Sequence, residues 1–436
     1  MKRHLVYFPV SFILLSFLTM AVVPGNGYGD ESEKSQGMLE LPGLISEALE
    51  RNPDIIAARD RWKSAQAIIG ARRAFPDPRF SYAYFIESVE TRVGPQRHIL
   101  SAKQTLPFYG KRNLRADIAT KEAEKLKQVY EATKREVIRQ VRRSFYDLFY
   151  VVTLIGITHR EKTLLERFER IARTKYETGR GLQQNILKVH VEISKLNERL
   201  LNLEKQKQTA EAMLNTLLNR PPTEPLAKPK QPDLMKISLR LEELLELAKE
   251  NRPELKATEA LIEKGESAYK LAKKDYYPDL TVGFNYIEVG DRPGDVEEEG
   301  KDAFNVMLSI NLPIWRKKLS SQAQSAHDTI AAYRSHYRNM LNRTLFEVKN
   351  NFFNIQTAHD TIELYKNVLI PQAEQSMESA EAGYITGIVS FLDLLDAERI
   401  LLNIQFGYWQ AYTEYLKHVN DLERAVGIQV AEYRPG

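Results

Sequence analysis

Two aspartates in an apolar, helix-forming segment have the residue type and spacing that most clearly suggest chemistry in this sequence. Asp393 and Asp396 are three residues apart within residues 384–398 (YITGIVSFLDLLDAE), a spacing that places both carboxylates on one face of a helix. Such acids can cap a helix, face water or line a pore. Ser390 and Asp393 have the spacing of a capping box with Asp in place of Glu, so Asp393 could serve only the amides of a helix start. Asp396 lies one turn further in, where the attraction of the helix dipole for an acid fades.

The sequence otherwise lacks the motifs of an enzyme or of a metal site. It has no cysteine, and its eight histidines are scattered without an HExxH or similar ligand spacing. It contains no Gly-rich phosphate loop and no G-x-S-x-G nucleophile motif. Asp295 and the glutamates at 297–299 form an acidic cluster, interpreted as a solvated loop. We predict no catalysis, no metal and no cofactor.

The overall charge gives no reason to expect a nucleic-acid partner. The formal net charge of the 436-residue chain is only +4, and no basic block is interleaved with aromatic residues. A hydrophobic fraction of 43% and a charged fraction of 28% indicate a chain that folds rather than a disordered one.

The N-terminus has the pattern of a secretory signal peptide. Lys2 and Arg3 precede an apolar run at residues 5–23, which is followed by Pro24 and small residues up to Gly29. We expect residues 1–29 to be removed, although the run is also long enough to act as an uncleaved anchor. No later stretch has the roughly 20 apolar residues of a membrane-spanning helix, so a mature chain that spans a membrane must use strands.

The rest of the sequence consists of two copies of one unit. The motifs of the first copy at 52–54 (NPD), 75–77 (FPD), 106–108 (LPF) and 176–179 (YETG) recur at 252–254 (RPE), 277–279 (YPD), 312–314 (LPI) and 384–387 (YITG). A Pro-rich segment separates the copies and has the composition of a linker. We therefore expect repeat 1 at 39–219, a linker at 220–238, repeat 2 at 239–427 and a tail at 428–436.

Each copy is predicted to fold as helix, strand, strand, very long helix, turn and helix. The strand segments, near 80–87, 98–106, 280–286 and 304–312, alternate apolar and polar residues. Apolar-out strands of about ten residues are typical of an outer-membrane barrel wall, and a soluble two-layer hairpin is the alternative. Four strands cannot close a barrel, but four from each of several chains can. The residues predicted to face lipid are Phe80, Tyr82, Tyr84, Leu280, Val282, Phe284, Tyr286, Phe304, Val306 and Leu308.

The helical segments are longer than a globular domain requires. No proline interrupts residues 111–178 or 315–370, and a helix of about 65 residues reaches roughly 100 Å. Apolar residues step by threes and fours through 182–217, the pattern of a coiled-coil seam. We expect each long helix to leave the strands, turn at Tyr-x-x-Gly and return as a shorter helix. The helix at 181–219 would be continued end to end by that at 239–274, and the C-terminal helix by the one starting at Leu44.

Three features together are typical of one known family: the duplicated unit, the paired Tyr-x-x-Gly turns and the two strand-to-helix junctions at 104–111 (QTLPFYGK) and 309–313 (SINLP). In these features the sequence resembles the TolC family of outer-membrane efflux proteins, from about residue 39 to 427. The resemblance implies a mainly α fold with a small β part, in which a homotrimer forms a 12-stranded outer-membrane β-barrel, four strands per chain. A periplasmic α-helical coiled-coil barrel would continue it, in the outer membrane of a Gram-negative bacterium.

The resemblance also implies partners and a passive role. The channel would conduct substrates from a periplasmic adaptor protein and an inner-membrane pump to the exterior. The junction at 106–112 (LPFYGKR) looks like those of the heavy-metal-cation branch, with drug efflux and a type I protein-secretion outlet as alternatives. A soluble periplasmic coiled-coil adaptor or scaffold is the alternative from another class, but it would have no reason to present lipid-facing aromatic residues.

Carried over to this sequence, the family pattern gives roles to the two turns. Asp393 and Asp396 would face the tunnel near its periplasmic mouth, where three copies form a ring that attracts cations. Repeat 1 has Asn185 and Lys188 at these positions. Tyr384 matches a gate position, yet Val389 replaces the family's arginine, so Tyr384 could also be a packing residue. The remaining turn residues are the helix-end glycines Gly179 and Gly387 with Tyr176 beside them, and the adaptor-docking candidates Arg180, Gly181, Leu182, Ile388 and Ser390.

Overall fold

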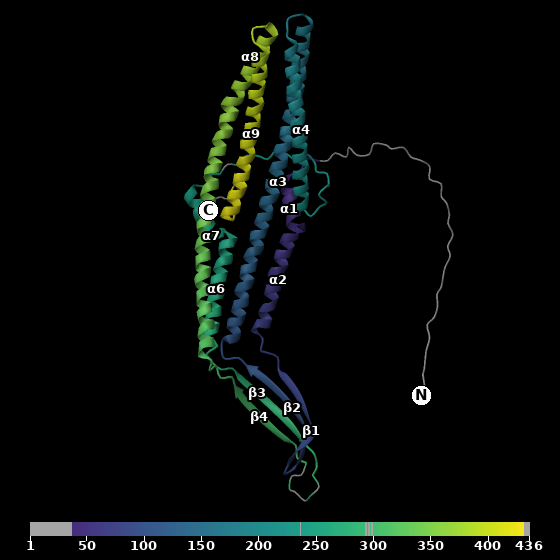
Figure 1. Ribbon diagram of the computed structural model, residues 1–436. Helices are drawn as coiled ribbons and strands as arrows, with labels where there is room; N and C mark the ends of the chain where they lie inside the picture. Colours follow the sequence, from purple (N-terminus) through teal and green to yellow (C-terminus); the bar gives the residue numbers. More distant parts are fainter. Residues whose placement is uncertain (1–36, 236, 293, 295–296, 298–299, 431–436) are drawn as a thin grey trace, which may run out of the picture. The chain divides into compact units, whose positions relative to one another are not determined.

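The computed structural model describes residues 37–235, 237–292, 294, 297 and 300–430. The predicted signal peptide lies outside these ranges, as do most of the acidic cluster at 295–299 and the last six residues of the predicted tail. Residues from Met38 onward form one unit, in which helices of very different length join a single sheet (Figure 1).

The elements of the two copies follow one another in the predicted order. Repeat 1 contains α1 (Leu41–Arg51), α2 (Pro53–Arg73), β1 (Arg79–Thr91), β2 (Gly94–Leu106), α3 (Lys111–Glu177) and α4 (Gln183–Leu217). Repeat 2 contains α5 (Leu241–Asn251), α6 (Pro253–Lys274), β3 (Leu280–Val289), β4 (Ala303–Ile310), α7 (Arg316–Leu364), a π-helical turn (Tyr365–Leu369), α8 (Ile370–Thr386) and α9 (Phe391–Val426). The predicted uninterrupted helix of repeat 1 is α3, with 67 residues.

Proline explains where the helices of each copy break. Pro53 and Pro253 open α2 and α6, because proline at the first turn needs no amide hydrogen bond whereas in a helix interior it would remove one. The side chain of Asn52 caps α2 by accepting hydrogen bonds from the amides of Asp54 and Ile55. In repeat 2, Pro371 lies two residues after the last residue of the π-helical turn, Leu369. The turn absorbs the backbone adjustment and lets the long helix continue to Thr386.

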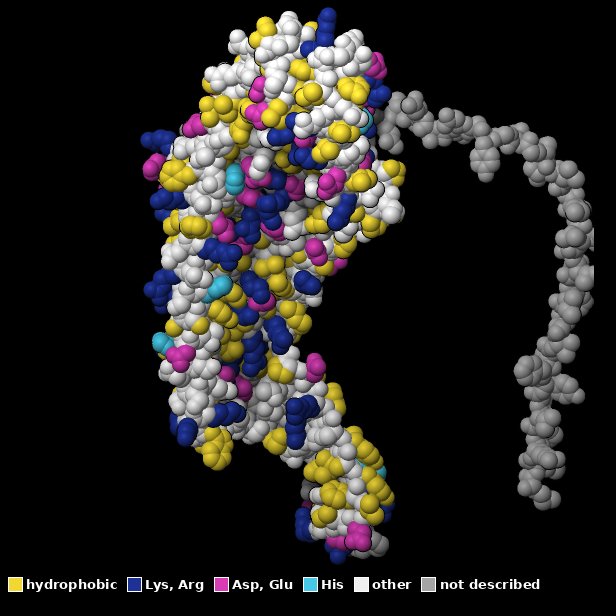
Figure 2. Space-filling model, turned by 45° about the horizontal axis from the view of Figure 1, so that its top comes forward, with side chains coloured by type: hydrophobic (Ala, Val, Ile, Leu, Met, Phe, Trp, Pro, Cys, Tyr) yellow, Lys and Arg dark blue, Asp and Glu magenta, His cyan; other side chains and the backbone are white. Residues whose placement is uncertain are grey.

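The sheet has one mainly apolar face and one face of mixed polarity. Its antiparallel strands lie in the order β1-β2-β3-β4, and directly paired residues point to the same side. Tyr82 pairs with Leu100, which pairs with Tyr286, and Tyr286 pairs with Phe304. The same register places all ten predicted lipid-facing residues on this face, where hydrophobic side chains gather over the strands (Figure 2). The opposite face carries polar pairs such as Asn285 with Asn305.

The helices pack through two clusters of buried apolar side chains. One cluster joins α1, α2, α3, α4, α5, α7 and α9 with the linker, and Phe145 of α3 is among its fully buried members. The other joins α3, α4, α8 and α9, with Phe168 and Leu394 fully buried. In α4, the predicted seam residues Val189, Leu196 and others at the same spacing are the buried ones. Among the helices that the structure describes, none has a stretch apolar enough to cross a bilayer.

The short helices meet end to end within each repeat, so the predicted stacking between repeats is wrong. Asn52 at the start of α2 donates from its side chain to the carbonyl of Leu217 at the end of α4, over 2.9 Å. At the end of α9, a Cβ added to Gly427 would lie only 2.7 Å from the carbonyl oxygen of Asn251, the residue at which α5 ends. Helix α4 is therefore continued by α2, and α9 by α6. The spacing of apolar residues shows which face of a helix is buried, but it does not show which other helix continues it end to end.

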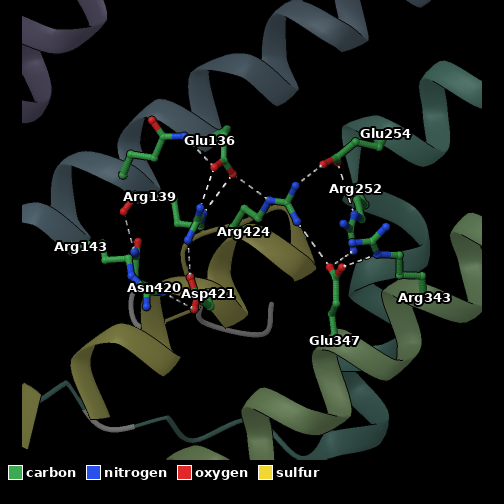
Figure 3. A network of polar contacts seen from close by, with 11 residues as sticks. Glu136, Arg139, Arg143, Arg252, Glu254, Arg343, Glu347, Asn420, Asp421 and Arg424 are labelled. Atoms are coloured by element: carbon green, nitrogen blue, oxygen red, sulfur yellow. Dashed lines mark hydrogen bonds and ion pairs between the residues drawn. The ribbon is translucent and has the colours of Figure 1, made fainter. Parts of the chain in front are cut away.

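A network of ion pairs fixes the junction between α9 and α6 (Figure 3). The guanidinium of Arg424 lies 3.2 Å from Glu136 of α3, 3.3 Å from Glu254 of α6 and 3.4 Å from Glu347 of α7. Although burial opposes ionisation, hydrogen bonds from Arg139 and Gln140 hold the pKa of Glu136 below its ordinary value. One arginine near the end of the C-terminal helix therefore ties together helices from both repeats.

Candidate functional site

The two Tyr-x-x-Gly turns have the left-handed glycines that the sequence predicts. Gly179 follows α3 with φ 72°, and Gly387 ends α8 with φ 86°. A residue with a Cβ is strained in this region, whereas glycine enters it freely, so both helices end at a point that the sequence defines. The turns position α4 and α9 for their return along α3 and α8.

The start of α9 holds the two acids, and Asp393 does cap the helix. The amide of Asp393 donates to the hydroxyl of Ser390 over 3.3 Å, and a carboxylate oxygen of Asp393 accepts from the amide of Ser390, also over 3.3 Å. The Ser390 hydroxyl also donates to this carboxylate over 2.7 Å. The predicted capping box is therefore confirmed with Asp at its third helical position.

Although Asp393 caps the helix, the negative charges of Asp393 and Asp396 are not neutralised by ion pairs in the described residues. Asp393 and Asp396 are both exposed on one side of α9, while Leu394 and Leu395 between them are buried. Within the described ranges, neither carboxylate pairs with a lysine or arginine side chain. The equivalents in repeat 1, Asn185 and Lys188, carry no negative charge. Repeat 2 alone thus offers two uncompensated carboxylates beside a turn, an arrangement that attracts cations.

Tyr384 contacts a cation that the sequence alone did not reveal. The tyrosine is 5% exposed, and its ring lies 5.1 Å from the ring of Phe391. The ammonium of Lys175, at the end of α3, donates to the carbonyl of Tyr384 and lies 4.4 Å from the centre of its ring. The contact with Tyr384 is therefore made by a lysine from the other hairpin, whereas Val389 stands in the turn after Tyr384. Lys175 immediately precedes the Tyr-x-x-Gly of repeat 1, the only signal that could have suggested it.

Two further ion pairs connect the hairpin of α3 and α4 with that of α8 and α9. Arg167 of α3 lies 2.5 Å from Glu381 of α8, and Arg399 of α9 lies 3.1 Å from Glu192 of α4. Both are partly exposed, so each contributes little alone, typically less than about 1 kcal/mol. Their role is to fix which faces of the two hairpins meet.

Two glutamates meet in the buried interface between these hairpins. Glu161 of α3 is 6% exposed and Glu398 of α9 is 4% exposed, and their carboxyl groups lie close enough to affect one another's ionisation. Burial and then the neighbouring Glu161 carboxyl raise the pKa of Glu398 to about 9, and burial also raises the pKa of Glu161. Two adjacent carboxylates cannot both ionise cheaply in such a place, so the pair holds a proton at neutral pH.

The predicted adaptor-docking residues lie at the exposed tips of the turns. Ile388 is 85% exposed and Leu182 66% exposed, both high values for branched apolar side chains. Tyr176, Arg180 and Ser390 are exposed as well, and Gly181 is partly covered. The structure brings them to two neighbouring hairpin turns (Figure 1), and their role in docking stays a prediction.

The fold defines a class of protein before any comparison is made. A four-stranded sheet with one apolar face, joined directly to helices of up to 67 residues, is built as one protomer of an outer-membrane channel with a long helical part. The sequence profile of outer membrane efflux proteins matches residues 44–220 and 244–428. The chain belongs to the outer membrane efflux protein family.

Individual relatives agree over nearly the whole chain. The chain is 23% identical over 403 residues to the cobalt-zinc-cadmium resistance protein CzcC of Cupriavidus metallidurans, covering 90% of this chain and 91% of that one. It is 22% identical over 418 residues to the outer membrane protein TolC of Vibrio cholerae, covering 89% and 90%. The solved structure of the outer-membrane channel OprN has a TM-score of 0.77 at 17% identity, covering 90% of each chain. The protein is therefore an efflux channel of the outer membrane with a periplasmic helical part, not an enzyme.

Proposed function

We propose that three copies of this chain form the exit channel of a tripartite pump that exports metal cations. Their sheets would together close a twelve-stranded barrel, with the apolar face toward lipid, and their helices would form the periplasmic tunnel. A periplasmic adaptor would dock at the exposed turn tips and connect the channel to an inner-membrane pump.

The uncompensated acids of repeat 2 are the observation that carries this proposal. Asp393 and Asp396 are exposed beside the α8–α9 turn without a cationic partner among the described residues. Three copies would place six carboxylates around the tunnel mouth, a ring that concentrates cations and repels anions. The similarity to CzcC, whose name assigns it cobalt, zinc and cadmium resistance, supports cations as the cargo over drugs or secreted proteins, to which the similarity to TolC also extends.

Neutralising the acidic pair in single-channel recordings tests this role. In planar bilayers, Asp393→Asn with Asp396→Asn is expected to lower the cation-to-anion permeability ratio and to weaken block by divalent cations. Asparagine is chosen at 393 because its side-chain oxygen can still accept the hydrogen bond from the amide of Ser390, so the change removes charge while preserving the turn.

A matched control lies on the same hairpin. Glu374 and Glu378 are exposed on α8, and within the described part of the chain they form no ion pair. Glu374→Gln with Glu378→Gln removes the same charge away from the start of α9 and should leave block and selectivity unchanged. Equal selectivity and blockade in the wild type and the Asp393/Asp396 variant would contradict a cation-attracting mouth.

A further inference from the structure

The strand-to-helix junction of repeat 2 exposes an aromatic residue followed by three cations. Ile314 is 65% exposed and Trp315 74% exposed, and Arg316, Lys317 and Lys318 after them are all exposed. Together with Ser321, these five residues line a shallow surface hollow. We refer to residues 314–318 as the junction patch.

The apolar face of the sheet continues into this patch. Val306, Leu308 and Ile310 of β4 are each more than half exposed on that face, and Leu312, just beyond the strand, is 67% exposed. A chain leaving the membrane in this direction passes from apolar side chains to an aromatic ring and then to positive charge. This is the order in which a bilayer presents its hydrocarbon, its interface and its headgroups.

The equivalent cations of repeat 1 have a different use. Counting from the Leu-Pro of each junction, Lys111 and Arg112 correspond to Lys317 and Lys318. Lys111 is 2% exposed, and its ammonium lies 2.9 Å from both a carboxylate oxygen of Asp279 and the carbonyl oxygen of Tyr277. Arg112 stacks on the ring of Phe75, with 3.5 Å between the guanidinium carbon and the ring centre. In repeat 1, both of these cations are therefore bound by partners within the protein.

The cations of repeat 2 are exposed instead. Among the residues that the structure describes, no carboxylate pairs with Arg316, Lys317 or Lys318, and only Arg316 contacts a ring, that of Tyr276 at 5.7 Å. These residues also form the first turn of α7, and that turn contains no acidic residue. Positive charge there opposes the helix dipole. Helix stability thus gives no reason for three cations at this point.

We propose that the junction patch binds the phosphate headgroups of anionic phospholipids in the periplasmic leaflet of the outer membrane. Arg316, Lys317 and Lys318 provide the charge, and Trp315 lies at the level of the interface. The inference rests on family membership, which places the helical part in the periplasm, and not on the metal cargo. Failure of the cation test at Asp393 and Asp396 would leave it intact.

Lipid competition on the purified trimer, read by native mass spectrometry, tests the proposal. With phosphatidylglycerol and phosphatidylcholine of the same chains, the wild type is expected to retain phosphatidylglycerol preferentially. Arg316→Gln with Lys317→Gln and Lys318→Gln should reduce this preference about tenfold or more, since each basic residue near a membrane surface adds to the attraction for anionic lipid. The preference should also weaken as salt is raised.

A control on the same helix separates this site from net charge. Lys349 and Lys366 are exposed further along the α7–α8 helix, without ion pairs in the described ranges, and Lys349→Gln with Lys366→Gln should keep the preference. Because the triple change relieves the helix dipole, the variant should fold, and an unchanged single-channel conductance verifies it. An equal preference in wild type and triple variant would overturn the proposal, as would preference for lipid A, an outer-leaflet lipid, over phosphatidylglycerol.

Discussion

The α3–α4 and α8–α9 hairpins share a backbone plan but differ in the residues that follow the turn. Both turn at a left-handed glycine, Gly179 or Gly387. Helix α4 starts at Gln183 without a side-chain cap, whereas α9 starts with the Ser390 capping box and exposes two acids. A duplicated unit has thus kept the residues that its geometry needs, and its copies differ in charge where the geometry leaves freedom.

The largest expected effect comes from the buried carboxyl pair where the hairpins meet. In the folded chain Glu398 has a pKa of about 9, whereas an unfolded glutamate ionises near its ordinary value. Between these two pH values the folded state holds more protons, so the free energy of unfolding falls as pH rises. Glu398→Gln removes this penalty and should stabilise the protein at pH 8 by up to about 5 kcal/mol, since each pH unit above the ordinary pKa of glutamate corresponds to about 1.4 kcal/mol.

Thermal unfolding followed by circular dichroism at several pH values measures this effect. The wild-type midpoint should fall between pH 6 and pH 9, and the midpoint of Glu398→Gln should fall less. Glu381→Gln is the control, because it removes a partly exposed acid paired with Arg167 and should not stabilise. Identical pH slopes in wild type and Glu398→Gln would show that Glu398 is ionised when folded.

An intermediate effect is expected from the contact between Lys175 and Tyr384. Lys175→Met keeps the aliphatic stem but loses the charge-assisted hydrogen bond to the Tyr384 carbonyl, typically about 1.5 to 3 kcal/mol. If this contact holds the two hairpins together at the mouth, the variant should open more often and show a larger mean conductance in planar bilayers. Lys162→Met is the control, because this lysine lies on the same helix α3 but further from the turn. A conductance equal to the wild type in Lys175→Met would mean that the contact only packs the turn.

The smallest expected effect comes from removing the side-chain cap that α9 has and α4 lacks. Ser390→Ala removes the hydroxyl of the capping box and should cost about 1 kcal/mol, seen as faster amide hydrogen exchange in the first turn of α9. Leu182→Ala, at the equivalent start of α4, removes an exposed side chain that caps nothing and should change exchange little. Similar exchange in the two variants would show that the cap does not hold α9 in place.

Features set by short-range pattern were predictable from the sequence. The glycines that end α3 and α8, the capping box at Ser390 and the single apolar face of the sheet follow from residue type and periodicity of two. The length of α3 follows from the absence of proline between 111 and 177.

Features that depend on which surfaces meet were not predictable in this way. The contact of Glu161 with Glu398 joins residues far apart in the chain, and each looks like an ordinary solvated charge in its own segment. Lys175 binds a backbone carbonyl, a partner that leaves no trace in the sequence. The stacking of α4 on α2 depends on the amide of Asn52 reaching Leu217, which apolar periodicity does not encode.

The π-helical turn at Tyr365–Leu369 determines the directions in which the side chains of α8 point around the helix axis. A single residue corresponds to about 100° of rotation around a helix axis, and a π-helical turn acts as one inserted residue. Ala373, Met377 and Tyr384 of α8 are therefore aimed by this turn as much as by their own spacing. Shortening the segment by one residue would keep every apolar side chain, yet it would swing Tyr384 away from Lys175.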